Sequence, residues 1–363
     1  MSEPCTWPYP AVATGIGPMP GVDSREAMNV AAGELADFIP LVELPARGPG
    51  ADPVGRTAAL LAEVDRSFEV ETTPSGWRLG HTGQRVLARA RGYLSEDIDA
   101  LEEFAAGSGN AVPIKVAIAG PWTLATKISD PAGEALLRDV GAVGDLTEAL
   151  AQAASDLVLR LRRWIADDAL VIQLDDDVVP RVLAGRVPMS SGRLTHRSVE
   201  PSVVQNRLRT VSAAIQSAGA RVVIRCHAQQ APVDLLRDTG TDALAVDLGR
   251  EQLDDDALPR AWEAGVGLLL GCVPILAGNP ESSGSAGSGD PGGSTERVGD
   301  TALSARLRGF MSEHGFASVP ANIAITPHGG LADISMEAAR ATISACARVG
   351  AVVRDEQENA DVR

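Results

Sequence analysis

The chain is poor in aromatic residues and in positive charge. Only 3% of its 363 residues are aromatic, so alanine, valine and leucine must supply most of the buried apolar surface. The formal net charge of −16 argues against nucleic acid or an anionic membrane surface as a partner. The same charge disfavours a polyanionic substrate, unless lysine and arginine side chains gather locally at the site.

Long apolar runs and a secretion signal are also absent. No run approaches the roughly 18 apolar residues of a membrane span, and residues 1–15 lack a basic stretch followed by an apolar one. The cysteines show no paired spacing, so thiols are expected instead of disulfides; they are Cys5, Cys226, Cys272 and Cys346. We therefore expect a cytoplasmic protein with no membrane partner.

One segment has little besides glycine, serine, proline and charge. Residues 278–298 cannot bury enough apolar surface to offset the entropy lost on ordering, which predicts a flexible loop. No G-x-G-x-x-G motif lies between a strand and a helix, and the glycines of this loop belong to a low-complexity stretch, so they do not indicate a phosphate-binding turn.

Eight short apolar runs, separated by longer amphipathic stretches, make up most of the remaining chain. The runs span residues 12–19, 38–45, 114–121, 170–176, 221–227, 243–249, 265–273 and 322–330. Most are apolar throughout, which is typical of parallel strands covered on both faces. The pattern predicts an α/β fold, a single (β/α)8 TIM barrel over residues 11–350 with an inserted hairpin near residues 68–80 and tails at 1–10 and 351–363. A doubly wound open sheet is the alternative.

Side chains able to bind or react follow several of the predicted strands. Active sites of such barrels lie at the carboxyl ends of the strands, because the βα loops gather there. Asp175 ends an apolar run, where an acid without a function would be a costly buried charge. Cys226 and His227 fit either a metal site or a buried thiol beside a hydrogen-bonded histidine. Trp122 fits either a stacking surface for a planar ligand or a filler of the barrel mouth.

Five short motifs occur in an order that is informative. They are TGIGPMPG (14–21), VAIAGPWTL (116–124), VIQLDDD (171–177), VDLG (246–249) and ITPHGGL (325–331). In this order they resemble the catalytic barrel of cobalamin-independent methionine synthase, within the superfamily that includes uroporphyrinogen decarboxylase. The resemblance spans most of the predicted barrel. It implies a role in methionine biosynthesis, with a methyl group passing from methyltetrahydrofolate to the thiol of homocysteine. In that family a zinc ion lowers the pKa of the thiol.

The resemblance also assigns roles to individual residues. Those expected to contact substrate are Ile16, Gly17, Asp52 and Asp175, with Trp122 as a further candidate. Those expected to hold zinc are Cys226, His227, Asp247 and His328. The set departs from the family pattern, because Ile224 and Gly329 stand where the family has a ligand histidine and a ligand cysteine. Pro274 stands where the family has a further histidine.

Three functions follow from these observations. The first is a zinc-dependent methyltransferase of the short, single-barrel type that acts on a small thiol. The second is a barrel that has lost catalysis and binds a metabolite or partner. Such a loss would replace family site residues, as Gly329 and Pro274 do here. The third is a cofactor-free lyase like uroporphyrinogen decarboxylase, which needs an arginine cluster near its first strand, where this chain offers only Arg25.

Overall fold

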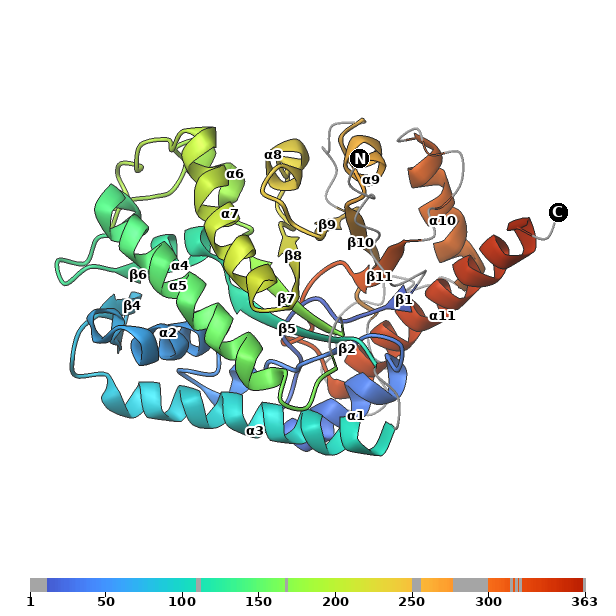
Figure 1. Cartoon of the computed structure of the whole chain (residues 1–363), viewed down its shortest axis with the longest axis horizontal. Helices are drawn as coiled ribbons and strands as arrows, with labels where there is room; N and C mark the ends of the chain where they lie inside the picture. Colours follow the sequence, from blue (N-terminus) through green and yellow to red (C-terminus); the bar gives the residue numbers. More distant parts are fainter. Residues whose placement is uncertain are drawn as a thin grey trace, which may run out of the picture.

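Eight parallel strands form the central sheet of the computed structural model (Figure 1), as the apolar runs predict. They are β1 (Val12–Ala13), β2 (Ile39–Pro40), β5 (Ile114–Ala119), β7 (Leu170–Asp175), β8 (Arg221–Arg225), β9 (Ala243–Asp247), β10 (Gly267–Val273) and β11 (Ile323–Pro327). Their order across the sheet is β1-β11-β10-β9-β8-β7-β5-β2, so the first strand pairs with the last, and every other pair of consecutive barrel strands except β1 and β2 lies side by side. A doubly wound sheet would reverse this order partway across. The structure therefore confirms a TIM-barrel-like α/β fold.

The structure describes residues 12–108, 112–166, 169–249, 256–276, 300–313 and 322–361, together with residues 316 and 319. The predicted loop at 278–298 and the predicted tail at 1–10 lie outside these ranges. None of the helices within them is long and apolar enough to cross a membrane.

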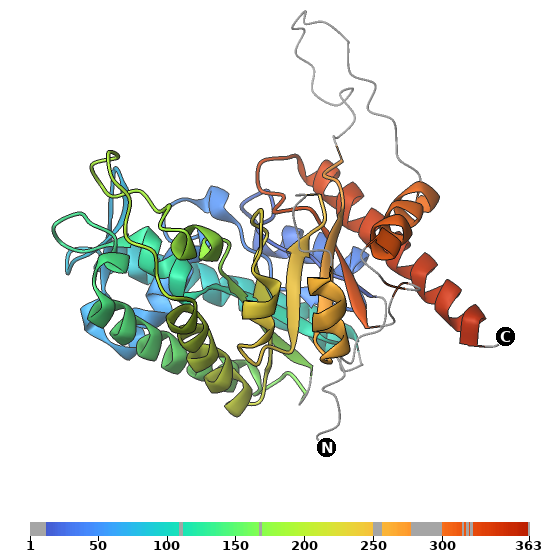
Figure 2. The same cartoon turned by 90° about the horizontal axis from the view of Figure 1, so that it is seen from above.

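Helices follow most of the barrel strands and cover the outside of the sheet (Figures 1 and 2). They are α1 (Ser24–Glu34), α2 (Pro53–Val64), α3 (Gln84–Ser108), α4 (Pro121–Lys127), α5 (Val140–Leu161), α6 (Val179–Leu183), α7 (Pro201–Ser217), α8 (Val233–Arg237), α9 (Ala257–Glu263), α10 (Asp300–Glu313) and α11 (Met336–Asp361). Three short 3-10 turns lie at Pro45–Arg47, Arg66–Phe68 and Leu136–Arg138. Helix α11 continues through residue 361, so residues 351–361 belong to the last helix of the barrel.

The barrel is held together differently at the seam between its first two strands. Among the described residues no backbone ladder joins β1 to β2, and both strands are shorter than the apolar runs that predict them. Pro40 has no backbone N–H to donate, which limits the length of β2. At the carboxyl end of the seam the Met19 N–H donates to the Glu43 carbonyl at 2.8 Å. On the outside, α1 packs against both α3 and α11, so the layer of helices continues across the seam.

The predicted hairpin is also present. Strands β3 (Val70–Thr73) and β4 (Gly76–Leu79) pair antiparallel, and β6 (Ile128–Ser129) joins β4 to make a small separate sheet. This sheet lies at the edge of the barrel near α2 and α4 (Figure 1).

Alternate residues of each barrel strand point to opposite faces, and this alternation separates two apolar cores. Outward-pointing residues such as Ile172, Leu174 and Ile224 belong to the large core under the helices. Inward-pointing residues form a second, smaller cluster inside the barrel: Val12, Ile16, Phe38, Val171, Val223, Ala243, Ala245, Leu269 and Ala324.

The inside of the barrel changes character along the strands. The apolar cluster occupies the amino-terminal part, and toward the carboxyl ends the inward positions become polar. Gln173 and Asp175 follow Val171 on the inner face of β7, and Arg225 follows Val223 on that of β8. The fold thus combines an apolar floor with a polar mouth, and the candidate site lies in this mouth.

Candidate functional site

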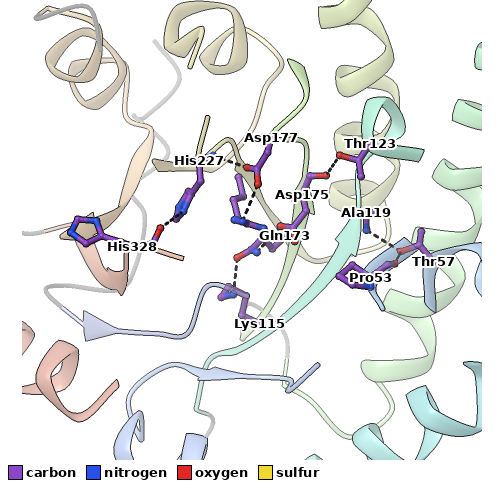
Figure 3. Close-up of polar contacts among 11 residues, drawn as sticks. Pro53, Thr57, Lys115, Ala119, Thr123, Gln173, Asp175, Asp177, His227 and His328 are labelled. Carbon is purple, nitrogen blue, oxygen red and sulfur yellow. Dashed lines mark hydrogen bonds and ion pairs between the residues drawn. The ribbon is translucent and has the colours of Figure 1, made fainter. Parts of the chain in front are cut away.

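Buried hydrogen bonds link β5, β7 and β8 inside the barrel (Figure 3). Lys115 Nζ donates to Gln173 Oε1 at 2.7 Å, and Gln173 Nε2 donates to Asp175 Oδ1 at 2.7 Å. The second oxygen of Asp175 accepts from Arg225 Nη1 at 2.9 Å. Burial lowers the pKa of Lys115 to about 8 although Asp175 acts in the opposite direction. Burial likewise raises the pKa of Asp175, and Arg225 counteracts it. Each charge in this group therefore depends on its partner to remain inside the barrel.

Glu43 is a further buried acid in this region, at the carboxyl end of β2. Its side chain is buried, and burial raises its pKa from 4.5 to about 7 despite the opposing charge of Arg56. Between about pH 4.5 and 7, Glu43 therefore keeps its proton in the folded protein but loses it in the unfolded chain. Because the folded state binds more protons there, stability must fall as the pH rises through this interval.

We expect Glu43→Gln to flatten that dependence. The wild type should lose about 3 kcal/mol of unfolding free energy through Glu43 between pH 4.5 and 7. The variant should lack this part of the loss, because glutamine stays neutral. Urea unfolding at pH 5 and at pH 7.5 measures the difference, with Glu63→Gln, at a half-exposed position, as the control. Identical pH profiles for the wild type and Glu43→Gln would refute the assignment.

Asp177 connects the ionic group to the loop after β8. Arg225 Nη2 donates to Asp177 Oδ2 at 2.9 Å, and the backbone N–H of His227 donates to Asp177 Oδ1 at 2.6 Å (Figure 3). Both outer nitrogens of Arg225 are therefore used, one by Asp175 and one by Asp177. The carboxylate of Asp177 fixes the backbone at His227, where the strand ends.

The imidazole of His227 is held as a neutral ring with one nitrogen unused. Its Nδ1 lies 3.1 Å from the carbonyl oxygen of His328, which can only accept, so Nδ1 carries the proton. Its Nε2 is buried and has no hydrogen-bond partner among the described residues. Burial, reinforced by the charge of Arg225, lowers the pKa of His227 to about 4. At neutral pH the Nε2 lone pair therefore has no hydrogen-bond donor among the described residues.

His328 and Asp247 form a second defined pair. His328 Nδ1 lies 2.6 Å from Asp247 Oδ1, and the Gly249 N–H donates to the same oxygen at 2.9 Å. Burial would raise the pKa of Asp247, but these hydrogen bonds outweigh it and the pKa is lowered. The carboxylate thus orients the ring and leaves Nε2 of His328 on the far side, as in a general base supported by an acid.

Gly249 makes room for this pair. A Cβ at Gly249 would lie 2.5 Å from His328 Cε1, so an alanine there must displace the ring from Asp247. We expect Gly249→Ala to lower the rate of any reaction that uses His328 by about 10²-fold, with little change in stability. Turnover together with the unfolding midpoint tests this, and Gly92→Ala, where a Cβ meets nothing within 4 Å, is the control. Unchanged turnover in Gly249→Ala would show that the position of the ring is unimportant.

The two histidines open on one pocket at the barrel mouth. Its volume is about 720 Å³, enough for a small metabolite. Its walls come from the loops after β7, β8 and β11; the lining residues include Asp177, Arg181, Arg186, Arg225, His227, Gln230, His328 and Gly329. Gln230 has a φ of 59° and is the only non-glycine residue in the described ranges with a positive φ. Strained backbone of this kind is often retained where a loop has a function.

The structure separates Cys226 from the other residues expected to hold zinc. Cys226 follows the outward-pointing Ile224 by two residues, so its side chain points to the same outer face. It is a fully buried member of the core under the helices. Burial, together with the charge of Asp177, raises the pKa of the Cys226 thiol far above its usual range. His227 and His328, in contrast, line the pocket. Within the described ranges no group of three or more His, Cys, Asp or Glu side chains is arranged to hold a metal ion. The residues present therefore do not fit the zinc site that the resemblance implies.

The residues expected to contact substrate are also dispersed. The Trp122 ring is buried, and its Nε1 donates to the Val204 carbonyl at 3.3 Å, so it fills the core and offers no stacking face. Asp52 caps helix α2 by accepting from the Gly55 N–H at 2.9 Å. Asp175 does point into the barrel, where Arg225 neutralises it.

Ile16 and Gly17 lie where β1 approaches the end of β11. Ile16 is part of the apolar cluster inside the barrel, so it is a core residue. A Cβ at Gly17 would lie 3.1 Å from the Cα of Gly330, so the glycine allows the two loops to approach closely. Neither residue lines the pocket described above.

Several residues of the mouth do not appear among those proposed from the sequence. Lys115 and Arg225 are charged positions inside apolar strands, and a charge there requires a buried partner. That requirement is the signal that would have identified them. Arg181 and Arg186 follow the acidic end of β7 in a stretch whose sequence has no distinguishing pattern.

Comparison with known proteins supports the fold and little more. No protein-family model matches the chain, and no curated protein sequence matches it. The structure is similar to that of a B12-independent methionine synthase from Shewanella sp. W3-18-1, solved in complex with selenomethionine. The TM-score is 0.60 with 10% sequence identity, over 96% of this chain and 99% of that chain. At such low identity the similarity shows a shared barrel fold.

Other solved structures are less similar. The pneumococcal virulence factor StrH gives a TM-score of 0.49 with 10% identity, covering 96% of this chain and 85% of that chain. A mutant tryptophan synthase α-subunit from Pyrococcus furiosus gives a TM-score of 0.40 with 12% identity, covering 94% and 98%. Similarity at this level does not distinguish the methyltransferase, the binding protein and the lyase from one another.

Proposed function

We propose that this barrel transfers a methyl group to a small thiol bound in the mouth pocket, and that the Asp247–His328 pair activates the thiol in place of zinc. The single observation that carries the proposal is the 2.6 Å contact between Asp247 Oδ1 and Nδ1 of His328, which lines the pocket. An oriented imidazole of this kind is a suitable base for a proton of moderate acidity such as that of a thiol. The ordered motifs that resemble methionine synthase, and the shared barrel fold, support methyl transfer as the reaction class.

The reaction balances without a metal. His328 Nε2 takes the proton from the thiol, and the thiolate sulfur attacks the methyl carbon of the donor. The new S–C bond forms as the bond from the methyl carbon to the donor breaks, and the donor leaves with the electron pair. His328 then returns the proton to the donor atom that carried the methyl group. The burial of Cys226 supports this metal-free route, because the thiolate ligand of the family's zinc site is missing from the mouth.

A binding protein without catalysis is the second candidate. It is favoured by the burial of Trp122 and Cys226, which removes two of the contacts that the resemblance implies. The lyase has less support, because Arg25 pairs with Glu103 at 2.7 Å on an exposed surface and leaves its charge outside the mouth.

A methyl-transfer assay with the purified chain separates these candidates. Homocysteine serves as acceptor and methyltetrahydrofolate as donor, with and without a zinc chelator. We expect methionine to form at the same rate in both conditions. Turnover that the chelator abolishes and zinc restores would refute the metal-free route. Binding of homocysteine without any turnover would favour the binding protein.

A further inference from the structure

The wall of the mouth pocket formed after β7 holds two arginines that form no ion pair with any described residue. Arg181 lies in helix α6, and Arg186 lies three residues beyond its end; both are exposed and both line the pocket. The Arg186 N–H donates to the Arg181 carbonyl at 2.8 Å, which closes a turn between them. The Nη2 of Arg181 reaches the Arg186 carbonyl at 3.5 Å, a weak contact that leaves the rest of both guanidinium groups available.

This turn is fixed by the segment that follows it. Gly185 has a φ of 61°, and a Cβ there would lie 2.9 Å from the backbone nitrogen of Ser198. The His196 N–H donates to the Val187 carbonyl at 2.8 Å, just after the turn. The two arginines therefore extend from a backbone that packing defines, and less freedom is lost when they bind a ligand.

Two of the three arginines that line the pocket form no ion pair with a described residue. Arg225 is already paired with Asp175 and Asp177, each at 2.9 Å, and among the described residues that line the pocket Asp177 is the only acidic one. Arg181 and Arg186 remain as two positive charges at the rim, in a chain whose formal net charge is −16. Such a local gathering of arginine is the condition under which an acidic protein binds an anion.

We propose that Arg181 and Arg186 form an anion subsite that holds a carboxylate or phosphate group of the molecule bound in the mouth. Guanidinium groups suit both anions, since they offer paired N–H donors in one plane. The subsite places the anionic end of the molecule at the rim and its other end toward His227 and His328. The inference deepens the proposed function and depends on it only for the reaction that the bound molecule undergoes.

Calorimetric titration of the full chain tests the subsite, with inorganic phosphate, malonate and homocysteine as separate probes. We expect at least one probe to bind the wild type and to bind Arg181→Gln/Arg186→Gln about 100-fold more weakly, about tenfold for each arginine. Arg193→Gln/Arg197→Gln is the matched control, because it removes the same charge from exposed positions outside the pocket. Its affinity should match that of the wild type. Preference for malonate or for phosphate identifies the acidic group.

Two results would overturn the subsite. One is a wild type that binds none of the probes at millimolar concentrations. The other is an equal loss of probe affinity in both double variants. That result would show that the overall charge of the protein, and not a contact with Arg181 and Arg186, sets the affinity. His328→Gln separates this test from that of the reaction, because it should bind the probe normally while turnover is lost. If probe binding survives in Arg181→Gln/Arg186→Gln and turnover still depends on His328, the subsite is wrong and the proposed reaction stands.

Discussion

Replacing His328 with glutamine is expected to lower the rate of methyl transfer by about 10²- to 10⁴-fold, the contribution typical of a positioned general base. Glutamine retains a side chain able to hydrogen-bond to Asp247, so the loop after β11 keeps its anchor, but it cannot accept a proton at neutral pH. The loss should appear in kcat more than in KM, because the missing step is the removal of the proton. Initial rates with homocysteine and methyltetrahydrofolate measure it.

His81→Gln is the matched control for this substitution. His81 also pairs with an acid, Glu69 at 3.3 Å, but its side chain is 80% exposed just after the hairpin. Its replacement should leave the rate unchanged. The unfolding midpoint of each variant shows whether the fold is retained. A His328→Gln variant that is folded and fully active would eliminate His328 as the base.

The second large effect concerns stability. Replacing Arg225 with methionine should lower the unfolding free energy by about 3–5 kcal/mol at neutral pH, because the carboxylate of Asp175 remains buried without a counter-charge. The pair is well shielded, with side-chain exposures of 14% for Arg225 and 11% for Asp175. Asp177, which accepts from the backbone N–H of His227, loses its ion pair as well.

The pH dependence of this effect has a definite sign. Burial already raises the pKa of Asp175, and loss of Arg225 must raise it further. The folded variant can therefore take up a proton that the unfolded chain does not hold, and the deficit relative to the wild type should shrink as the pH falls. Urea unfolding at pH 8 and pH 5 measures it. A deficit that is the same at both pH values would contradict the proposed cause.

Arg221→Met provides the control on the same strand. Arg221 lies near Asp242 at 3.9 Å and is more exposed, so its loss should cost less than about 1 kcal/mol. In Arg225→Met, a second change of Asp175 to Asn should recover part of the lost stability, since the uncompensated charge is removed. Equal destabilisation by the two arginine variants would show that the buried pair has no special importance.

The sequence alone determined the α/β class and favoured a barrel over a doubly wound sheet, and the strand order in the structure decided between them. Eight runs of mainly apolar residues could be strands only if both faces were covered, and the helical stretches between them supplied the cover. The hairpin near residues 68–80 and the polar ends of the strands were visible for the same reason, since they interrupt the pattern. Charged positions within the apolar runs, Lys115 and Arg225, also carried information about a polar interior, because such charges cannot be buried without partners.

The composition of the site was decided by the tertiary structure. A change of one residue in a strand reverses the face to which a side chain points, so the sequence motif around Cys226 could not show that its thiol enters the outer core. His227 and His328 are 101 residues apart, and they meet because β8 and β11 curve around one mouth. Arg181 and Arg186 reach the same pocket through a turn whose conformation depends on packing against a later segment. Local sequence sets the residue types at the strand ends, while the closure of the barrel decides which of them face one another.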